Sequence, residues 1–407
     1  MIKPSILLLS WRDYYNPKKG GAEVFDYEIL KRLAIEGYKV VWLAPKFDGC
    51  SDVEEKEGIT YIRMGKFYNI HLLAIKFLHK YSSLFDIVID ELHGYPFFTN
   101  LYLNKPKVTI VHEVAGEIWF KMMKFPISFF GYLFEKFFYK LLINHKFLAP
   151  SNSTKEDLIN QGIKSKNIFI IDEGSNTNRV KSLNYKKNDY QICFVGRICK
   201  MKGIADLITA FSLVQEKVPQ SNLVLVGKVD KLYENELYSL INKYNLKDKV
   251  KVTGFVDDLE KEDYMKQSKY LVSCSVKEGF GLIIVEANSL GTPAITYNVN
   301  GYRDIIKNNI TGYLVEKGNI DALSKRIIQS LNENNAKYKG IQKNSFIESK
   351  KYNWDSVSKK FEDMIQEVIS SYNQSNNRSN TISKFIVKFI FLISNLVGNI
   401  ASKLKVI

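Results

Sequence analysis

The sequence has few cysteines, four in 407 residues: Cys50, Cys193, Cys199 and Cys274. No two of them have the CxxC spacing of a zinc or redox motif, and no histidine is close to any of them in sequence. Cys193 and Cys274 stand in apolar, strand-like runs, which favours buried free thiols in a reducing compartment over a disulfide framework. The N-terminal MIKPSILLLSW is too short for a secretory signal and is typical of a first strand.

Acidic residues are scarce relative to basic ones. Forty-three Asp and Glu stand against 58 Lys and Arg, a formal net charge of +15. Such an excess favours an anionic partner, such as nucleic acid, a membrane surface or a phosphorylated substrate, although a solvated lysine-rich surface would give the same balance. The chain is long for a single hydrophobic core, so we expect two domains.

Short β-branched runs alternate with amphipathic helical patterns from residue 5 onward. In the first half, strands are expected at 5–11, 39–44, 59–64, 86–92, 107–113 and 147–151. In the second half, they are expected at 192–196, 223–227, 251–254, 270–275 and 294–298. This alternation predicts an α/β protein with two doubly wound, Rossmann-like parallel sheets. The predicted organisation is an N-terminal domain at 1–178, a basic polar linker at 179–190 and a C-terminal domain at 191–352.

The C-terminal region differs in composition. A helix is expected at 353–372, followed by a linker and tail at 373–407. Residues 378–407 contain five basic residues and no acidic one, and their apolar residues recur with a helical period. Polar residues interrupt this run, which argues against a spanning helix and favours an amphipathic helix at 381–407 on an anionic membrane surface. Packing on the protein is the alternative. The aromatic and lysine-rich segment 116–146 is either a second membrane contact or a buried helix with its loop.

Three predicted strands are followed by loops that suit phosphate binding. The first is NPKKGGAEVF at 16–25, with Gly20 and Gly21 before a helix. The second, GRICKMKGI at 196–204, carries Arg197 and Lys202. Helix N-termini present unpaired amides to anions, and the carboxyl ends of parallel strands are where such sheets bind ligands. These loops therefore predict a site for a diphosphate.

The third loop, VKEGFGLIIVEANSLGTP at 276–293, contains two glutamates eight residues apart, Glu278 and Glu286. Carboxylates accept hydrogen bonds from hydroxyls, so two carboxylates around a phosphate site suggest a sugar nucleotide. The backbone amides of Phe280, Gly281 and Leu282 would face the phosphate. The alternative is that Glu278 only complements the helix dipole and Glu286 is a surface residue.

At these residues the sequence resembles the GT-B-fold glycosyltransferases of family 4, also called glycosyl transferases group 1, which are retaining enzymes that use nucleotide sugars. The resemblance covers roughly residues 5–370 and is carried by GGAE at 20–23, VGRICKMKG at 195–203 and EGFGLIIVEA at 278–287. The last stretch matches the family's E-x7-E element. The resemblance implies two Rossmann-like domains that face a cleft, with the donor on the C-terminal domain and the acceptor mainly on the N-terminal one.

The resemblance also implies roles for individual residues. Arg197 and Lys202 would hold the donor diphosphate, Glu278 would bind the donor sugar, and Glu286 would bind the ribose. The implied donor-binding set is Gly20, Gly21, Arg197, Lys202, Gly254, Phe255, Glu278, Phe280, Gly281, Leu282 and Glu286. The implied catalytic set is His112, Glu278, Lys202 and Arg197. His112 would lie close to the anomeric carbon, and its alternative is a histidine that only caps a loop.

The sequence departs from the family's pattern at two places. IDEGSN at 171–176 stands where the family often has Asn-Gly-Val-Asp, and Asp304 stands where a glutamate is common. No DxD-type metal motif is evident, so Lys and Arg would carry the electrostatic work without a metal or other cofactor. Retention without an enzymic nucleophile implies front-face attack.

The sequence therefore predicts a retaining hexosyltransferase that uses a nucleotide sugar, with a UDP-hexose such as UDP-glucose as the commonest donor. Its acceptor would be a lipid-linked or cell-envelope glycan, with protein N-glycan assembly as one option. We expect a cytoplasmic enzyme attached peripherally to the inner face of the membrane, without a nucleic-acid partner. The alternatives are a soluble enzyme with a small acceptor, a non-catalytic nucleotide-binding subunit, and a nicotinamide oxidoreductase. The absence of GxGxxG in the first βα turn disfavours the oxidoreductase.

Overall fold

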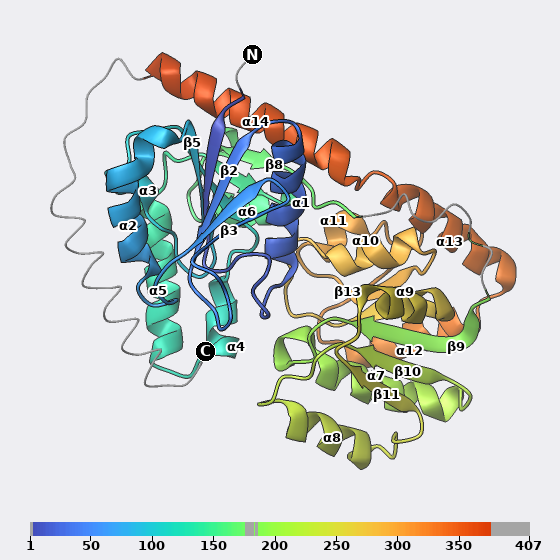
Figure 1. Cartoon of the computed structure of the whole chain (residues 1–407). Coiled ribbons are helices and arrows are strands. Elements are labelled where there is room, and N and C mark those ends of the chain that lie inside the picture. Colours follow the sequence, from blue (N-terminus) through green and yellow to red (C-terminus); the bar gives the residue numbers. More distant parts are fainter. Residues whose placement is uncertain (1–2, 176–182, 184–185, 376–407) are drawn as a thin grey trace. The chain divides into compact units, whose positions relative to one another are not determined.

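The computed structural model describes residues 3–175, 183 and 186–375 (Figure 1). The chain divides into two compact units. The first contains residues 1–119, 125–173 and the chain from Trp354 on, and the second contains residues 120–124 and 174–353. The predicted tail at 381–407 lies outside the described residues. Among the helices that the structure describes, none has the length and apolar character needed to cross a bilayer.

The first unit is built on an eight-stranded sheet in the order β3-β4-β2-β1-β5-β6-β7-β8. Its strands are β1 (Ser5–Leu9), β2 (Lys39–Ala44), β3 (Val53–Lys56), β4 (Ile59–Arg63), β5 (Ile87–Leu92), β6 (Lys107–Val111), β7 (Phe147–Ala149) and β8 (Ile168–Ile170). All neighbouring strands are parallel except the β3–β4 pair at one edge. The order reverses between β1 and β5, which makes this the switch point of the sheet.

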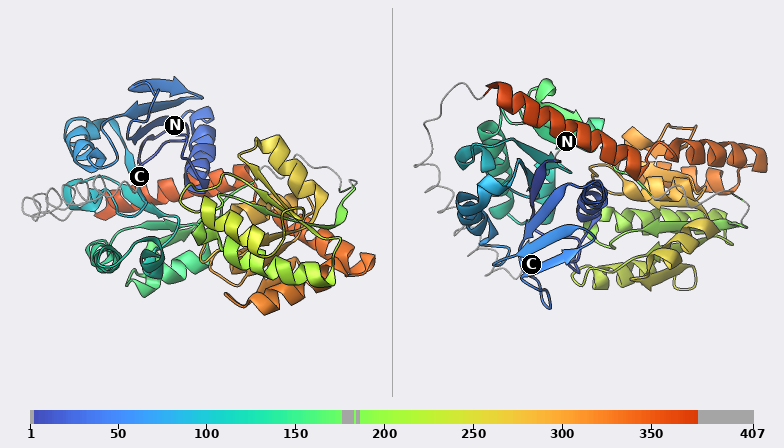
Figure 2. Two further views of the ribbon diagram at one scale, coloured as in Figure 1. Left: turned by 90° about the horizontal axis from the view of Figure 1, so that it is seen from below. Right: turned by 45° about the horizontal axis from the view of Figure 1, so that its top comes forward.

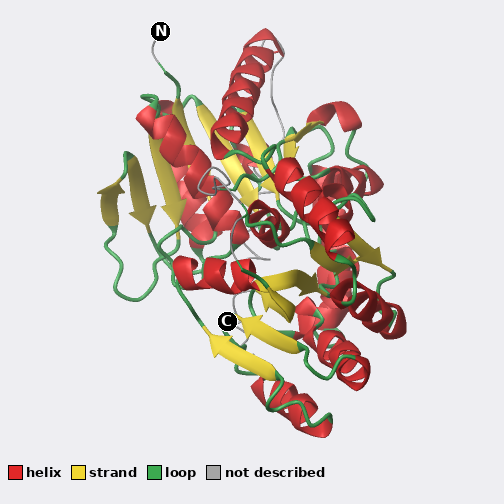
Figure 3. Ribbon diagram, turned by 90° about the vertical axis from the view of Figure 1, so that its right-hand side faces the viewer, coloured by secondary structure: helices red, strands yellow, loops and turns green. Residues whose placement is uncertain are grey.

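Helices cover both faces of this sheet, as Figures 2 and 3 show. The helices of this unit are α1 (Gly21–Ile35), α2 (Ile70–Tyr81), α3 (Thr99–Tyr102), α5 (Ile127–Leu141), α6 (Asn152–Asn160) and α14 (Trp354–Ser375), whereas α4 (Trp119–Met122) begins in this unit and continues into the second. Alternation along β1 explains the two faces: Ile6 and Leu8 pack with α1 and α14, whereas Leu7 and Leu9 pack with α2. The helix expected at 353–372 is thus α14, and it packs against α1.

The second unit has a six-stranded, wholly parallel sheet in the order β11-β10-β9-β12-β13-β14. Its strands are β9 (Asn188–Val195), β10 (Asn222–Val226), β11 (Val250–Gly254), β12 (Ser268–Ser273), β13 (Ala294–Tyr297) and β14 (Gly312–Val315). Its helices are α7 (Ile204–Lys217), α8 (Glu234–Lys243), α9 (Asp258–Gln267), α10 (Leu282–Ser289), α11 (Tyr302–Ile305), α12 (Ile320–Leu331) and α13 (Asn335–Ser349), with a short 3-10 turn at Lys200–Lys202. This strand order is that of doubly wound nucleotide-binding sheets.

The prediction of two Rossmann-like sheets is confirmed, and each expected strand is present with small shifts at its ends. Three strands were not predicted: β3, β8 and β14. The sequence of β3, VEEK, is polar and mostly exposed, so it has no apolar signal. Strand β9 begins at Asn188, inside the range predicted as a linker. Its first three residues are exposed, so the apolar pattern that predicts a strand starts only after them. All four cysteines are free; three are buried and Cys50 is half-buried.

Candidate functional site

The switch point of the second sheet lies between β9 and β12. Ligands of such sheets bind beyond the carboxyl ends of the strands at this point. The chain leaves β9 at Val195 into the loop that carries Arg197 and Lys202, and it leaves β12 at Ser273 into the loop that carries Glu278. The topology therefore brings two of the three loops singled out in the sequence to one edge.

Gly203 allows these two loops to pack closely. Its φ of 65° is in the left-handed region, and a Cβ there would lie 2.0 Å from the carbonyl oxygen of Cys274. The amide of Val276 donates to the carbonyl of Met201 at 3.0 Å, which fixes one loop against the other. Lys202, immediately before the glycine, is thereby held next to the Glu278 loop.

Lys202 and Glu278 are in direct contact, because Lys202 Nζ donates to Glu278 Oε1. The hydroxyl of Tyr302 lies 3.3 Å from the same carboxylate oxygen and 2.7 Å from the Ser273 hydroxyl. Burial raises the pKa of Tyr302 well above its usual value, so its phenol stays protonated and can donate to Glu278. A cation and a phenol therefore orient the Glu278 carboxylate. Sequence reasoning missed Tyr302, which carries no motif and reaches the site only through the fold.

Helix α10 starts directly after this loop. Gly281 is its N-cap at a φ of 113°, and a Cβ on it would lie 2.8 Å from the ring of Tyr302. The side chain of Phe280 is 3% exposed and packs edge-on against Tyr352 at 5.5 Å between ring centroids. Phe280 and Gly281 can therefore offer a ligand only their backbone, while Leu282 is half-buried at the first helical position. The contact of these three amides with a phosphate stays a prediction.

Glu286 is separate from this contact and pairs with Lys261 of α9. Lys261 Nζ lies 3.1 Å from Glu286 Oε2 and 3.1 Å from Asp258 Oδ1. Burial lowers the pKa of Lys261, but the carboxylates of Glu286 and Asp258 outweigh this effect and leave it raised. Lys261 was not predicted, and it competes with any hydroxyl that Glu286 is to bind.

This competition gives a testable result. We expect Glu286→Ala to weaken the binding of a nucleoside diphosphate, because ribose hydroxyls would lose their acceptor. Lys261→Met should strengthen it, because the carboxylate is released from its partner, by a few fold for a partly exposed pair. Titration calorimetry would measure both, with Lys266→Met, at the other end of the same helix, as the matched control. Unchanged affinity in Glu286→Ala would reject the ribose role.

The remaining predicted residues of the second unit lie at the same edge. Arg197 is exposed and has no hydrogen bond or ion pair with any residue that the structure describes. Gly254 ends β11, and its carbonyl accepts from the amide of Gly227 at 3.0 Å. A Cβ on Gly227 would lie 2.1 Å from the carbonyl oxygen of Gly196, so the loops after β9, β10 and β11 touch through backbone. Phe255, next to Gly254, is 82% exposed, which suits a planar ligand.

Gly20, Gly21 and His112 belong to the first unit. Gly20 is the N-cap of α1, and its amide donates to Glu23 Oε2 at 2.6 Å. Glu23 is fully buried and accepts from Arg12 Nε at 2.8 Å with its other oxygen. A Cβ on Gly21 would meet nothing within 4 Å, so packing does not require this glycine. Glu23 and Arg12 therefore hold the turn at Gly20, and the space around Gly21 at the start of α1 is open.

His112 directly follows β6 and lies in a cluster of buried carboxylates. Its Nε2 is 3.8 Å from Glu91 Oε1, and its Nδ1 is 3.7 Å from Glu173 Oε1. Asp26 of α1 also reaches this point, and the ligand atoms of Asp26, Glu91 and His112 all lie within 4.8 Å of one another. The two Glu91 oxygens are buried and accept no hydrogen bond from any described residue. This trio is the only group with metal-ligand spacing that the described residues provide; the sequence predicted no metal there.

The cluster holds more carboxylates than cations. Burial raises the pKa of Asp26 to about 7 and that of Glu91 well above its usual value. Burial lowers the pKa of His112, but Glu173 and Asp26 outweigh it and the net shift is upward. Burial thus favours the neutral forms of the Asp26 and Glu91 carboxyls, whereas Glu173 and Asp26, where ionised, favour the protonated imidazole of His112. Glu91 was not predicted from the sequence, although the two carboxylates in the apolar run of β5, Asp90 and Glu91, indicated a special role for this strand. Glu173 comes from the IDEGSN stretch, where the chain departs from the family.

This cluster should make stability depend on pH. The raised pKa values mean that the folded state binds more protons than the unfolded state between about pH 4 and pH 7. The free energy of unfolding should therefore fall as pH rises through this window. Urea titrations across the window would measure it. Asp26→Asn should flatten the decline, whereas the exposed Asp248→Asn should leave it unchanged. An identical slope in Asp26→Asn would show that the carboxyl does not titrate as stated.

Two Rossmann-like units, each with its candidate residues beyond the carboxyl ends of its central strands, define a GT-B-fold glycosyltransferase. The chain belongs to this family by sequence as well: the family model described as Glycosyltransferase Family 4 matches residues 19–179, and that described as Glycosyl transferases group 1 matches residues 175–351. The two matches overlap at residues 175–179, and together they include every strand of both sheets except β1.

Relatives support the same assignment. An uncharacterized glycosyltransferase of Methanocaldococcus jannaschii, MJ1069, is 23% identical over 90% of this chain and 99% of its own. The UDP-Gal:alpha-D-GlcNAc-diphosphoundecaprenol alpha-1,3-galactosyltransferase of Escherichia coli is 30% identical over 37% of this chain and 38% of its own. Among solved structures, sucrose-phosphate synthase from Thermosynechococcus elongatus has a TM-score of 0.76 at 20% identity, over 91% of this chain and all of that one. This last similarity shows the fold.

Proposed function

We propose that the protein transfers a hexose, with retention, from a UDP-sugar such as UDP-glucose to a lipid-linked or cell-envelope glycan, of which an intermediate of protein N-glycan assembly is one example. The observation that carries the proposal is the contact between Lys202 and Glu278 at the switch point of the second sheet. The choice of donor and acceptor is supported by the Escherichia coli relative, whose name specifies UDP-galactose and a diphosphoundecaprenol acceptor.

The contact explains how a donor would be received. The ammonium of Lys202 and the carboxylate of Glu278 neutralise each other. A sugar nucleotide supplies a partner for each: its diphosphate for Lys202 and the exposed Arg197, and its sugar hydroxyls for Glu278. Tyr302 keeps the carboxylate in place during this exchange. As the glycosidic bond breaks, negative charge grows on the diphosphate, and the two cations stabilise it without a metal ion. Glu286 would hold the ribose, and Gly20 and Gly21 would approach the diphosphate.

His112 is proposed to act near the anomeric carbon, in the role that the family resemblance assigns to it. An imidazole beside the carboxyls of Glu173 and Glu91 would donate hydrogen bonds when protonated, and in that form it would suit a hydroxyl of the donor sugar better than the acceptor's nucleophilic oxygen. The leaving phosphate would then accept the acceptor's proton in a front-face reaction. The enzyme would work on the cytoplasmic side of the cell membrane, with residues 381–407 as its attachment.

A donor panel tests the proposal. We would incubate the protein with UDP-, GDP- and ADP-hexoses and a membrane extract, and measure the release of nucleoside diphosphate in buffer with EDTA. UDP-hexose should give the largest release, and the release should depend on the extract. A requirement for a divalent ion would contradict the cation-based scheme. Release from none of the donors, with an extract that supplies acceptors to a known glycosyltransferase, would contradict the proposed function.

A further inference from the structure

The outward side of α5 is unusually apolar. Large hydrophobic residues recur along it at helical spacing and continue at both ends. They are Phe125, Phe129, Phe130, Leu133, Phe137 and Ile143, all exposed, with Phe130 at 65% and Phe125 at 80%. A helix on the surface of a water-soluble domain normally turns charged and polar residues to this side, so an apolar stripe of this length marks an interaction surface.

The charges on the same side of α5 are all positive. Lys136 and Lys140 are exposed between the apolar residues. The one acidic residue of the helix, Glu135, points inward and is 3% exposed. Its carboxylate accepts from the amides of Ala115 and Gly116 at 2.8 and 2.7 Å and from Trp119 Nε1 at 3.0 Å. The outer surface of the helix therefore joins aromatic and aliphatic side chains to lysines and no carboxylate.

We propose that this surface, hereafter the α5 face (Phe125, Phe129, Phe130, Leu133, Lys136, Phe137, Lys140 and Ile143), docks on an anionic phospholipid bilayer. Aromatic and aliphatic side chains enter the boundary between headgroups and acyl chains, while lysines remain at the level of the phosphates. Lipid phosphates complement the one sign of charge present. The α5 face is formed by described residues and does not include residues 381–407.

The inner side of α5 connects this surface to His112. Glu135 fixes the turn at Gly116–Ile118, which begins four residues after His112. Trp119 packs on the helix at Gly131, where a Cβ would come within 2.5 Å of its ring. Docking therefore sets the height of the His112 loop above the bilayer. The next step rests on the proposed function: docking places the His112 loop at the level of the headgroup of a lipid-linked acceptor.

Vesicle binding of the full-length protein tests the α5 face. The probes are vesicles of phosphatidylcholine alone and of phosphatidylcholine mixed with phosphatidylglycerol. Phe129→Ser with Phe130→Ser should lower the partition coefficient on mixed vesicles by about tenfold for each side chain removed. Leu84→Ser with Leu232→Ser, two exposed leucines elsewhere, is the matched control and should change nothing. Lys136→Glu with Lys140→Glu should remove the preference for mixed vesicles, whereas Lys164→Glu should not.

A local readout separates this face from any other membrane contact. In Phe130→Trp, brominated lipids should quench the added fluorescence on mixed vesicles; in Tyr238→Trp, the exposed control on α8, they should not. Vesicle binding without quenching at position 130 would overturn the proposal. A concentration-dependent dimer that Phe129→Ser with Phe130→Ser dissociates would also overturn it, because the occupant would then be a second copy. Neither assay uses a nucleotide-sugar donor. Docking of the α5 face can therefore be disproved while the proposed glycosyl transfer stands, and glycosyl transfer can be disproved while the docking stands.

Discussion

Replacing Lys202 with alanine is expected to lower the turnover number by about 10²–10³, the loss typical of a preorganised group that stabilises developing charge. Glu278 accepts a hydrogen bond from the ammonium, and the backbone contact between Val276 and Met201 fixes the loop that carries Lys202. Its interaction with the diphosphate strengthens as the leaving group gains charge, so its loss should appear mainly in kcat.

Lys200 provides the matched control for this prediction. It lies two residues earlier in the same short turn and is exposed. Lys200→Ala should leave turnover near the wild-type value, because its ammonium is not held at Glu278. Initial rates of UDP release over a range of donor concentrations would separate kcat from KM. A rise in KM with kcat unchanged would mean that Lys202 binds the donor equally in the ground state and the transition state, and the charge-stabilising role would be wrong.

Much of this site could be predicted from the sequence because its residues lie in short segments at strand ends. The spacing of Glu278 and Glu286 and the glycines around them are local features, and strand–helix alternation places them at one edge. Tyr302 and Lys261 could not be predicted, since each meets its glutamate from another helix and neither lies in a motif. The contacts of Tyr302 and Lys261 depend on how the segments pack at the edge of the sheet. The order of residues along the chain does not contain this information.

The same reasoning applies to the segment 116–146. Its density of aromatic residues fits a buried helix and an interfacial helix equally well, and the sequence left both open. The structure buries Phe138, Tyr139 and Leu142 on one side of α5 and exposes Phe129, Phe130 and the rest of the α5 face on the other. Nothing in the composition tells which aromatics form the core, because both sides are rich in them.

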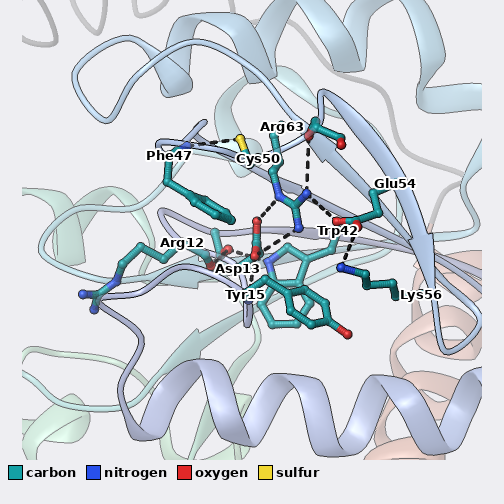
Figure 4. Close-up of polar contacts among 11 residues, drawn as sticks. Arg12, Asp13, Tyr15, Trp42, Phe47, Cys50, Glu54, Lys56 and Arg63 are labelled. Carbon is teal, nitrogen blue, oxygen red and sulfur yellow. Dashed lines mark hydrogen bonds and ion pairs between the residues drawn. The ribbon is translucent and has the colours of Figure 1, made fainter. Parts of the chain in front are cut away.

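Replacing Arg63 with methionine is expected to lower the free energy of unfolding by about 3–5 kcal/mol, the cost of leaving a buried charge without its partner. Figure 4 shows Asp13 and Glu54 directed at the Arg63 guanidinium. Arg63 Nε lies 2.6 Å from Asp13 Oδ2, and Nη1 lies 2.8 Å from Glu54 Oε2. The side chains of Arg63 and Asp13 are 1% and 0% exposed, so water cannot replace the lost partner.

The pair matters for the site because Asp13 shapes the loop that leads to Gly20. Its carboxylate also accepts from the amide of Tyr15 at 2.8 Å, and a loosened loop would misplace the start of α1.

Urea unfolding followed by circular dichroism would measure the change. Lys46→Met, which removes an exposed ion pair with Asp52 nearby, should cost no more than about 1 kcal/mol. Asp13→Asn combined with Arg63→Met should cost less than the sum of the single changes, because neither charge is then left alone. Equal losses in Arg63→Met and Lys46→Met would show that the buried pair does not hold the loop.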